Sequence, residues 1–504
     1  MTGGGGRLSQ QELETYLWGA ATLLRGLVDA SDYKQYVFPL LFFKRLSDVW
    51  DEEHAQALSD TGDEDYATAS ANDRFEIPPG AHWSDVRTAT KDVGRALLTA
   101  FRAIEQANPE RLGGVFGNAP WTDKAQMPDE TLKNLIEHFS KHTLSLTLVP
   151  EDEVGNGYEY LIRQFADDSG HTAQEFYTNR TVVHLMTQML EPAPGELIYD
   201  PTCGTGGMLI SALADVKQRG ADHRTIGLFG QELIGITAAI ARMNLVLHGV
   251  EDFHIATGNT LSNPAFLDGD RLKTFDVILA NPPYSIKKWN RDAWQQDQWG
   301  RNFLGTPPQG RADYAFLQHI LKSLDPKTGR CAILFPHGVL FRQEEAAMRV
   351  KLIESDLLEC VLGLGPNLFY NSPMEACIVV CRMNKSEERR GKVLFLNAVN
   401  EVARVSAQSS LLPSHQDRIV SAYRNFKNEV GFSSVVAIEH ILQRGSTLSI
   451  PLYVRESRSV VDGDDASTLT QAWDDLSADE ADFWIQMNEL AKLLEDVTAE
   501  SDRA

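Results

Sequence analysis

The stretch that decides the fold reads LIYDPTCGTGG and spans residues 197–207. An apolar run ends in an acid and a glycine-rich turn, and a helix-forming segment continues to about residue 218. Glycines at such a point let the backbone turn tightly and approach a ligand, while the helix start offers free N–H groups. A strand, a glycine turn and a helix in this order predict one unit of an α/β sheet with a ligand at its edge.

Short apolar runs alternate with helical segments on the carboxyl side of this stretch. The runs expected as strands lie near residues 227–230, 253–256, 275–280, 331–335 and 360–364. The alternation predicts a doubly wound, mostly parallel sheet. A last run near 378–381 follows its predecessor with no room for a crossover helix, so we expect an antiparallel strand there and seven strands in all.

The rest of the chain is predicted to be mainly helical. Apolar residues recur at three- and four-residue spacing over 13–27 and 33–46, which indicates helices packed on a core. The acidic stretch from Asp51 to Asp73 is expected to be a loop. Residues 476–497 again show helical spacing, after an acidic link at Asp462–Asp465. We therefore expect three domains: a helical N-terminal domain (1–155), the α/β domain (156–400), and a C-terminal region with helices (401–504).

Composition narrows the class of protein. The net charge is −23, which argues against simple nucleic-acid binding by the whole chain. However, residues 461–504 hold 13 acidic side chains against Lys492 and Arg503, whereas residues 281–330 hold eight basic against four acidic ones. The sequence has no run of eighteen or more apolar residues, so no membrane span is expected. Residues 1–7 lack the apolar core of a signal peptide, and a cytoplasmic protein is therefore expected. The five cysteines form no CxxC pair and predict buried thiols and no metal site.

Two further strand ends carry candidate site residues. Glu232 ends the second strand about thirty residues after the glycine turn, where an acid can accept hydrogen bonds from both hydroxyls of a ribose. Asn259 and Thr260 follow the third strand. Because the carboxyl ends of parallel strands meet at one edge, these side chains and the glycine turn should form one site.

The strongest candidate for catalysis is Asn281-Pro282-Pro283-Tyr284, which ends the strand FDVILA. The prolines cannot donate to the sheet and stiffen the strand exit. The Asn281 amide oxygen and the Pro282 carbonyl can then accept two hydrogen bonds from one amino group, which frees the lone pair of that nitrogen. The Tyr284 ring offers a face on which an extruded base can stack.

These segments resemble S-adenosylmethionine-dependent methyltransferases that act on amino groups. The Asp/Asn-Pro-Pro-Tyr/Phe tetrapeptide and an Asp/Glu-x-x-x-Gly-x-Gly loop are typical of that class. In its pattern an Asp commonly stands at position 259 and bonds the adenine amino group of the cofactor; the Asn present can accept through its amide oxygen. The resemblance implies contacts of the glycine loop with the cofactor, through Asp200, Thr202, Gly204, Thr205, Gly206 and Gly207.

Over residues 8–400 the chain resembles one family, the modification subunits of type I restriction–modification systems. Their Gly-x-Phe-Tyr-Thr-Pro-Arg segment corresponds to residues 173–180 here, and the order of motifs is that of the gamma class of adenine-N6 DNA methyltransferases. The resemblance implies that this segment closes over the cofactor and that Phe369 stacks on the flipped base, although core packing explains Phe369 equally well. The implied closing residues are Gln174, Glu175, Phe176, Tyr177, Thr178 and Asn179.

The resemblance also implies partners. Such subunits work as two copies around one DNA-specificity subunit on double-stranded DNA, and a restriction (translocase) subunit can join them in phage defence. The C-terminal helices would then contact the specificity subunit. Two alternatives remain open from the sequence: an amino-group methyltransferase acting on protein glutamine or RNA, and a non-catalytic assembly subunit.

Overall fold

The computed structural model describes residues 7–68, 74–168, 178–284, 286–368, 375–405 and 408–454. The predicted helix at 476–497, the link at 462–465, Gln174 to Tyr177, and Phe369 lie outside these residues. Among the described residues, no helix is both long and apolar enough to cross a membrane.

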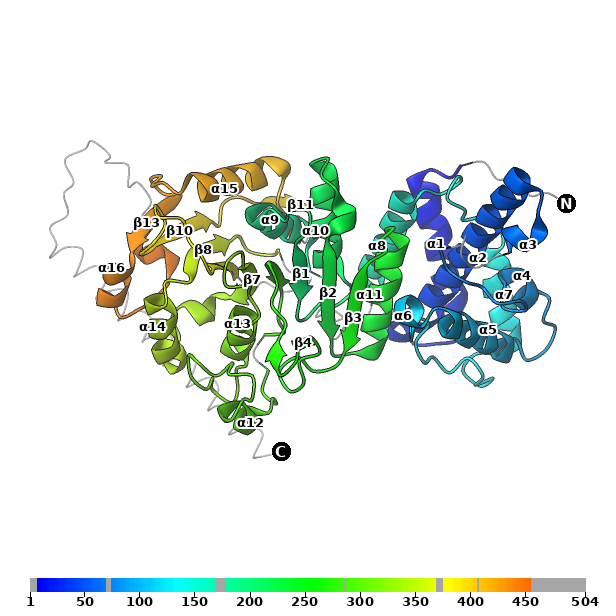
Figure 1. Ribbon diagram of the computed structural model, residues 1–504, viewed down its shortest axis with the longest axis horizontal. Helices are drawn as coiled ribbons and strands as arrows, with labels where there is room; N and C mark the ends of the chain where they lie inside the picture. The colour runs from blue at the N-terminus through cyan, green and yellow to red at the C-terminus, as the bar shows by residue number, and fades with distance from the viewer. Residues whose placement is uncertain are drawn as a thin grey trace, which may run out of the picture. The chain divides into compact units, whose positions relative to one another are not determined.

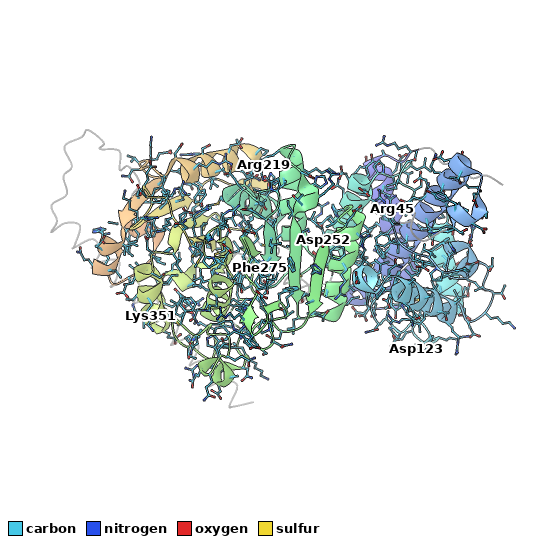
Figure 2. The ribbon with its side chains drawn as sticks, in the orientation of Figure 1. Arg45, Asp123, Arg219, Asp252, Phe275 and Lys351 are labelled. Carbon is cyan, nitrogen blue, oxygen red and sulfur yellow. The ribbon has the colours of Figure 1, made fainter. Side chains whose placement is uncertain are left out.

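The N-terminal part is helical, as predicted (Figure 1). Its helices are α1 (Gln10–Leu24), α2 (Lys34–Thr61), α3 (Glu64–Ala67), α4 (Trp83–Arg87), α5 (Val93–Ala107), α6 (Pro109–Leu112), α7 (Asp129–Phe139) and α8 (Glu151–Asp168). Ser9 and Glu12 form a capping box at the start of α1. The guanidinium of Arg45, labelled in Figure 2, donates to the carbonyls of Leu144 (2.5 Å) and Val149 (2.7 Å) and so ties α2 to the segment before α8.

The prediction of a loop at Asp51–Asp73 is wrong over most of the described part of this stretch, because α2 continues to Thr61 and α3 spans Glu64–Ala67. Its acidic residues lie on a helix face instead of in a connection, and one of them has a structural role. The Glu52 carboxylate accepts the backbone N–H groups of Leu146 (2.7 Å) and Thr147 (3.1 Å). The helix ends at Gly62, whose φ of 67° suits a C-terminal glycine.

The α/β part contains the predicted doubly wound sheet. Its strands are β1 (Leu197–Asp200), β2 (Gly227–Glu232), β3 (Phe253–Thr257), β6 (Val277–Ala280), β7 (Arg330–Pro336), β8 (Leu358–Leu364), β9 (Ala376–Arg382), β10 (Lys392–Ala398) and β13 (Ser433–Ala437). They lie in the order β13-β10-β8-β9-β7-β6-β1-β2-β3. The seven expected strands are adjacent, and β9 is antiparallel to both β7 and β8, as predicted.

The strand count was too low, since β10 and β13 extend the sheet to nine strands. β10 pairs parallel to β8, and β13 pairs antiparallel to β10. Residues after 400 thus contribute a strand to the sheet. The small pairs β4 (Leu267–Asp268) with β5 (Arg271–Leu272), and β11 (Ala403–Val405) with β12 (Gln408–Ser410), lie apart from it.

The helices after α8 belong to the α/β part, and several of them pack on the sheet. They are α9 (Arg180–Leu190), α10 (Gly207–Gln218), α11 (Gly235–Leu247), α12 (Arg291–Gln295), α13 (Asp313–Lys322), α14 (Ala346–Glu354), α15 (Pro413–Asn425) and α16 (Ile438–Gln443). On one side α9, α10 and α15 share a core with the strands. On the other side α13 packs with the rings of Tyr199 and Phe275, whose centroids lie 4.5 Å apart in a stacked arrangement. α11 contributes Ile240 and Met243 to the core of the N-terminal helices.

Candidate active site

A cavity of about 440 Å³ opens at the carboxyl ends of β1, β2, β3 and β6. This is the edge at which ligands bind in doubly wound sheets, and the volume lies in the range of small-molecule sites. Eight residues predicted from sequence line it: Thr202, Gly204, Glu232, Asn259, Thr260, Asn281, Pro283 and Tyr284. The structure therefore brings the ends of four strands to one site.

The glycine loop is shaped for a close backbone approach. Gly204 and Gly206 have φ values of 52° and 83°, in the left-handed region that favours glycine. Asp200 lies beneath the loop and accepts the Thr202 N–H at 3.0 Å. Burial raises the pKa of the Asp200 carboxyl to about 8, and the nearby Glu232 adds to that rise.

Glu232 holds the loop as well as facing the cavity. Its two oxygens accept the N–H groups of Gly204 (3.0 Å) and Ile234 (2.9 Å). Burial raises the pKa of this carboxyl, and these backbone bonds oppose the rise. Each carboxylate oxygen keeps a free lone pair, so Glu232 can still accept ribose hydroxyls.

Asn259 has a different contact from the one that the methyltransferase pattern implies. Its Oδ1 accepts the N–H groups of Leu261 (2.9 Å) and Ser262 (3.2 Å), and so caps the turn after β3. The Thr260 hydroxyl donates to the Pro201 carbonyl at 2.6 Å and ties that turn to the glycine loop. Both residues line the cavity, but their side-chain oxygens face the protein backbone.

Asn281 and Tyr284 are in direct contact. The Tyr284 hydroxyl donates to Asn281 Oδ1 at 2.8 Å, and Asn281 Nδ2 donates to the Thr178 hydroxyl oxygen at 2.9 Å. Thr178 thus brings the end of the predicted closing segment to the tetrapeptide. Burial raises the pKa of the Tyr284 phenol well above its usual range, so the ring stays neutral.

Among the residues that the structure describes, the other predicted site residues do not line the cavity: Thr178, Asn179, Asp200, Thr205, Gly206, Gly207 and Pro282. Asn179 caps α9 by accepting the Thr181 N–H at 3.0 Å, and it donates to the Ser409 carbonyl at 3.1 Å. The Thr205 carbonyl accepts from Asn244 at 2.9 Å. Gly207 packs so closely on Arg180 that an added Cβ would lie 1.4 Å from the guanidinium. These contacts support the loop from behind.

Sequence reasoning missed several wall residues. Leu233 and Ile234 follow Glu232 and give the cavity an apolar side, and Leu233 is 62% exposed. Phe316 reaches the cavity from α13, and Lys288 and Trp289 reach it from the segment after the tetrapeptide. In the sequence, the signal for Leu233 and Ile234 was that two apolar residues directly follow the acid that ends a strand.

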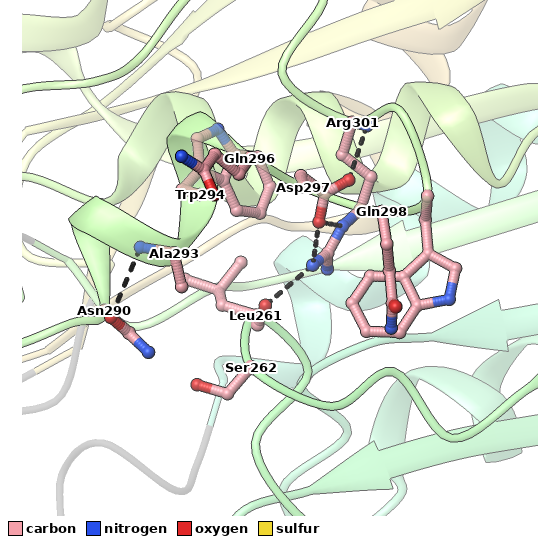
Figure 3. Close-up of a pocket in the computed structure, with 10 residues that line it drawn as sticks. Leu261, Ser262, Asn290, Ala293, Trp294, Gln296, Asp297, Gln298 and Arg301 are labelled. Carbon is pink, nitrogen blue, oxygen red and sulfur yellow. Dashed lines mark hydrogen bonds and ion pairs between the residues drawn. The ribbon is translucent and has the colours of Figure 1, made fainter.

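Arg301 fixes the segment after the tetrapeptide to the turn after β3 (Figure 3). This buried guanidinium donates to the carbonyls of Thr260 (3.0 Å) and Leu261 (2.8 Å) and to Asp297 (2.6 Å). The rings of Trp294 and Trp299 lie 4.6 and 4.7 Å from it. A cavity of about 220 Å³ borders this cluster.

The basic stretch at 281–330 is therefore only partly available to an anionic ligand. Arg301 is paired with Asp297, and Arg330 is paired with Glu196 at 2.8 Å, so both support the fold. Lys287 and Lys288 are exposed beside the tetrapeptide. Among the described residues, no group of acidic, cysteine or histidine side chains could hold a metal ion.

The residues of the cavity fit S-adenosylmethionine. The Glu232 carboxylate can accept hydrogen bonds from the two hydroxyls of a ribose. The apolar wall suits an adenine ring, and the backbone of the glycine turn suits an amino-acid chain. The Glu232 carboxyl, which lines the cavity, also suits a cationic ligand. The fold and this site define a doubly wound methyltransferase that acts on an amino group.

Comparisons with known proteins identify the family. Residues 149–461 match the family described as N-6 DNA Methylase, and residues 13–139 match the HsdM N-terminal domain. The chain belongs to the N-6 DNA methylases, and within them to the methyltransferase (modification) subunits of type I restriction–modification systems. The expectation drawn from the sequence resemblance is confirmed.

Individual relatives cover most of the chain. It is 30% identical to the type I restriction enzyme MjaVIII methylase subunit of Methanocaldococcus jannaschii, over 94% of this chain and 82% of that protein. The MjaIX methylase subunit of the same organism is 27% identical, over 88% of this chain and 84% of its own. The crystal structure of a type I methyltransferase subunit from Streptococcus thermophilus superposes with a TM-score of 0.77 and 30% identity, over 89% of this chain and all of that one.

Proposed function

We propose that this chain, as the modification subunit of a type I complex, uses S-adenosylmethionine to methylate N6 of an adenine flipped out of double-stranded DNA. Its family methylates adenine in DNA. One observation carries the assignment of residues. Glu232 and Asn281 line one continuous cavity, so a bound cofactor and the amide that receives the base share a single space.

The chain's own residues supply the positioning. Glu232 binds the ribose hydroxyls, and the glycine loop and closing segment receive the methionine end. The Asn281 amide oxygen and the Pro282 carbonyl accept the two hydrogens of the adenine amine and direct its lone pair at the cofactor. When bound, S-adenosylmethionine supplies the methyl group. The Tyr284 ring stacks on the extruded base.

DNA binding is proposed to be shared among subunits. The exposed Lys287 and Lys288 beside the tetrapeptide suit backbone phosphates near the target base. Because the net charge of the chain is −23, we assign most of the phosphate contacts to a partner subunit. We therefore propose an assembly of two copies with one DNA-specificity subunit in the cytoplasm, to which a restriction subunit can be added for phage defence.

The test is methyl transfer from tritiated S-adenosylmethionine by the full chain assembled with its specificity subunit. Label is expected in the N6-methyladenine of duplex DNA that contains the recognition sequence, and none in DNA where that adenine is replaced. If label is found only in protein or RNA, DNA is not the substrate, and the chain is an amino-group methyltransferase acting on protein or RNA. If calorimetry shows no cofactor binding at millimolar concentration, the chain is instead a non-catalytic assembly subunit.

A further inference from the structure

Glu159 is a partly buried carboxylate on α8 that binds two residues of the α/β part. Its Oε2 accepts a hydrogen bond from Arg180 Nε at 2.7 Å, and the two side chains form an ion pair. Its Oε1 accepts from Asn244 Nδ2 at 2.6 Å. Because Arg180 begins α9 and Asn244 lies on α11, one carboxylate joins three helices.

Both partners of this carboxylate contact the glycine loop. Asn244 Nδ2 also donates to the Thr205 carbonyl at 2.9 Å. The guanidinium of Arg180 lies against Gly207 so closely that any Cβ at that position would overlap it. Thr205 and Gly207 flank Gly206, whose φ of 83° forms the turn into α10. Through its partners, the carboxylate therefore supports the loop at two points.

The contact of Asn244 with the loop depends on the carboxylate. A carboxylate and a backbone carbonyl accept hydrogen bonds and cannot donate them, so the NH₂ group of Asn244 has to face both. Although burial acts to raise the pKa of this carboxyl, Arg180, His248 and the hydrogen bond from Asn244 hold the pKa below its usual value, and the group is ionised at neutral pH. Glu159 thus turns the amide so that its second N–H meets Thr205.

The helix that carries this carboxylate is a firm support. Tyr158 and Leu161 of α8 are fully buried in the core of the N-terminal helices, to which α11 contributes Ile240. Because α8 and α11 pack in the same core, the spacing between Glu159 and Asn244 is set by that packing.

We propose that Glu159 is a positioning residue for the cofactor, which acts through Asn244 and Arg180 to hold the glycine loop in the shape that binds S-adenosylmethionine. The proposal rests on the proposed function, because that function assigns the cofactor to this loop. It places part of the support for the cofactor site in a helix of the N-terminal core. The carboxylate acts from behind the loop and needs no contact with the cofactor.

The test is Glu159→Gln, studied as the full chain with its specificity subunit. The glutamine keeps the shape of the side chain, but one acceptor oxygen becomes an NH₂ group that cannot accept from Asn244 or Arg180. The Kd for S-adenosylmethionine, measured by calorimetry, should rise by about tenfold, the lower end of what a hydrogen bond to a charged group contributes. The single-turnover rate of tritium transfer at saturating cofactor and DNA should change by less than about threefold, because loss of binding alone leaves the saturated rate unaltered.

Asp152→Asn is the matched control. Asp152 lies on the same helix and forms an ion pair with Lys217 of α10 at 3.0 Å. This pair also joins α8 to the helix that follows the glycine loop, but at the last turn of α10, away from the loop. Its loss should leave the Kd within about twofold of that of the unaltered protein, because an exposed ion pair contributes little.

A double substitution tests whether Glu159 acts through Asn244. Asn244→Ala removes the donor to Thr205 and should itself raise the Kd by about tenfold. In that background a glutamine at position 159 can turn its oxygen to Arg180 without conflict, so adding Glu159→Gln should raise the Kd by less than about threefold more. A second full tenfold rise would mean that the two residues act independently, and it overturns the proposal.

Urea unfolding of the same variants separates positioning from general support. If Glu159→Gln lowers the free energy of unfolding and leaves the Kd unchanged, Glu159 has only a structural role and the proposal is overturned. Glu159→Asp, which keeps the charge but is too short to reach both partners, covers the case in which the uncharged variant does not fold, and the same rise in Kd is expected. Absence of cofactor binding by the unaltered complex would contradict the proposed function instead.

Discussion

The hydroxyl of Tyr284 donates a hydrogen bond to Asn281 Oδ1 across 2.8 Å. That oxygen is the acceptor that the proposed reaction assigns to the adenine amine. In the protein without a base, the phenol therefore occupies a position that the amine hydrogen takes during transfer. An entering adenine has to displace the hydroxyl or share the oxygen with it, while the ring remains available for stacking.

Replacing Tyr284 by Phe should therefore be tolerated. The ring that stacks on the base is kept, and the competing hydroxyl is removed, so we expect a single-turnover rate equal to or up to about threefold above that of the unaltered protein. Tyr284→Ala loses the stacking, which contributes about 1–3 kcal/mol per base, and should be slower by roughly 5- to 150-fold. Tritium transfer to duplex DNA measures both. A loss in Tyr284→Phe as large as in Tyr284→Ala would show that the hydroxyl itself takes part in transfer.

Glu232→Gln should weaken cofactor binding more than transfer. Gln has one acceptor oxygen, so the N–H of either Gly204 or Ile234 would face an NH₂ group and lose its bond. The ribose hydroxyls then also lose a charged acceptor, and a hydrogen bond to a charged group contributes about 1.5–3 kcal/mol, which corresponds to a roughly 10- to 150-fold higher Kd for S-adenosylmethionine. Calorimetry measures this Kd, and Glu191→Gln, at an exposed ion pair with Arg424, is the control. An unchanged Kd would mean that Glu232 only braces the loop.

The fold was largely predictable because buried parallel strands are short apolar runs with glycine turns between them. β10 and β13 were missed because they extend the sheet beyond the repeated strand–helix pattern. The acidic part of α2 was missed because its charges lie on a solvated helix face. The tetrapeptide and Glu232 could be predicted, because each is recognised from neighbouring residues in the sequence. In contrast, Thr178 and Asn281 are 103 positions apart in sequence, and only the folded chain brings them together.

Asp200 should make stability depend on pH in the cofactor-free protein. Burial raises the pKa of its carboxyl from 3.8 to about 8, so between these values the folded protein holds a proton that the unfolded chain has lost. The stabilisation is complete below about pH 4 and is lost as pH rises to 8, at no more than about 1.4 kcal/mol per pH unit. Asp200→Asn keeps the neutral form and should remove this slope.

Urea unfolding at several values between pH 5 and 8 measures the effect as the difference in free energy of unfolding between Asp200→Asn and the unaltered protein. That difference should increase with pH in favour of the variant. Asp222→Asn is the control, because a hydrogen bond from Arg224 lowers the pKa of the Asp222 carboxyl and places its titration below this range. Parallel curves for Asp200→Asn and the unaltered protein would show that Asp200 is ionised throughout.

Arg301→Lys should be far from conservative. The guanidinium bonds two carbonyls of the turn after β3 and Asp297 at once, and it lies between two tryptophan rings. A lysine ammonium cannot match this planar arrangement, and it leaves acceptors unpaired in a site where Arg301 is 1% exposed. Breaking a buried ion pair costs about 3–5 kcal/mol, so we expect Arg301→Met to lower the free energy of unfolding by that amount and Arg301→Lys by less.

Arg301→Lys should also weaken cofactor binding, because Thr260 and Leu261, whose carbonyls Arg301 bonds, line the cavity. We expect the Kd for S-adenosylmethionine to rise by about tenfold in Arg301→Lys, measured by calorimetry at a temperature where the variant is folded by circular dichroism. Arg224→Gln, which removes the exposed pair with Asp222, should change neither stability nor Kd appreciably. If Arg301→Lys is less stable yet binds the cofactor normally, the turn keeps its shape without the arginine, and the segment after the tetrapeptide is not coupled to cofactor binding through this side chain.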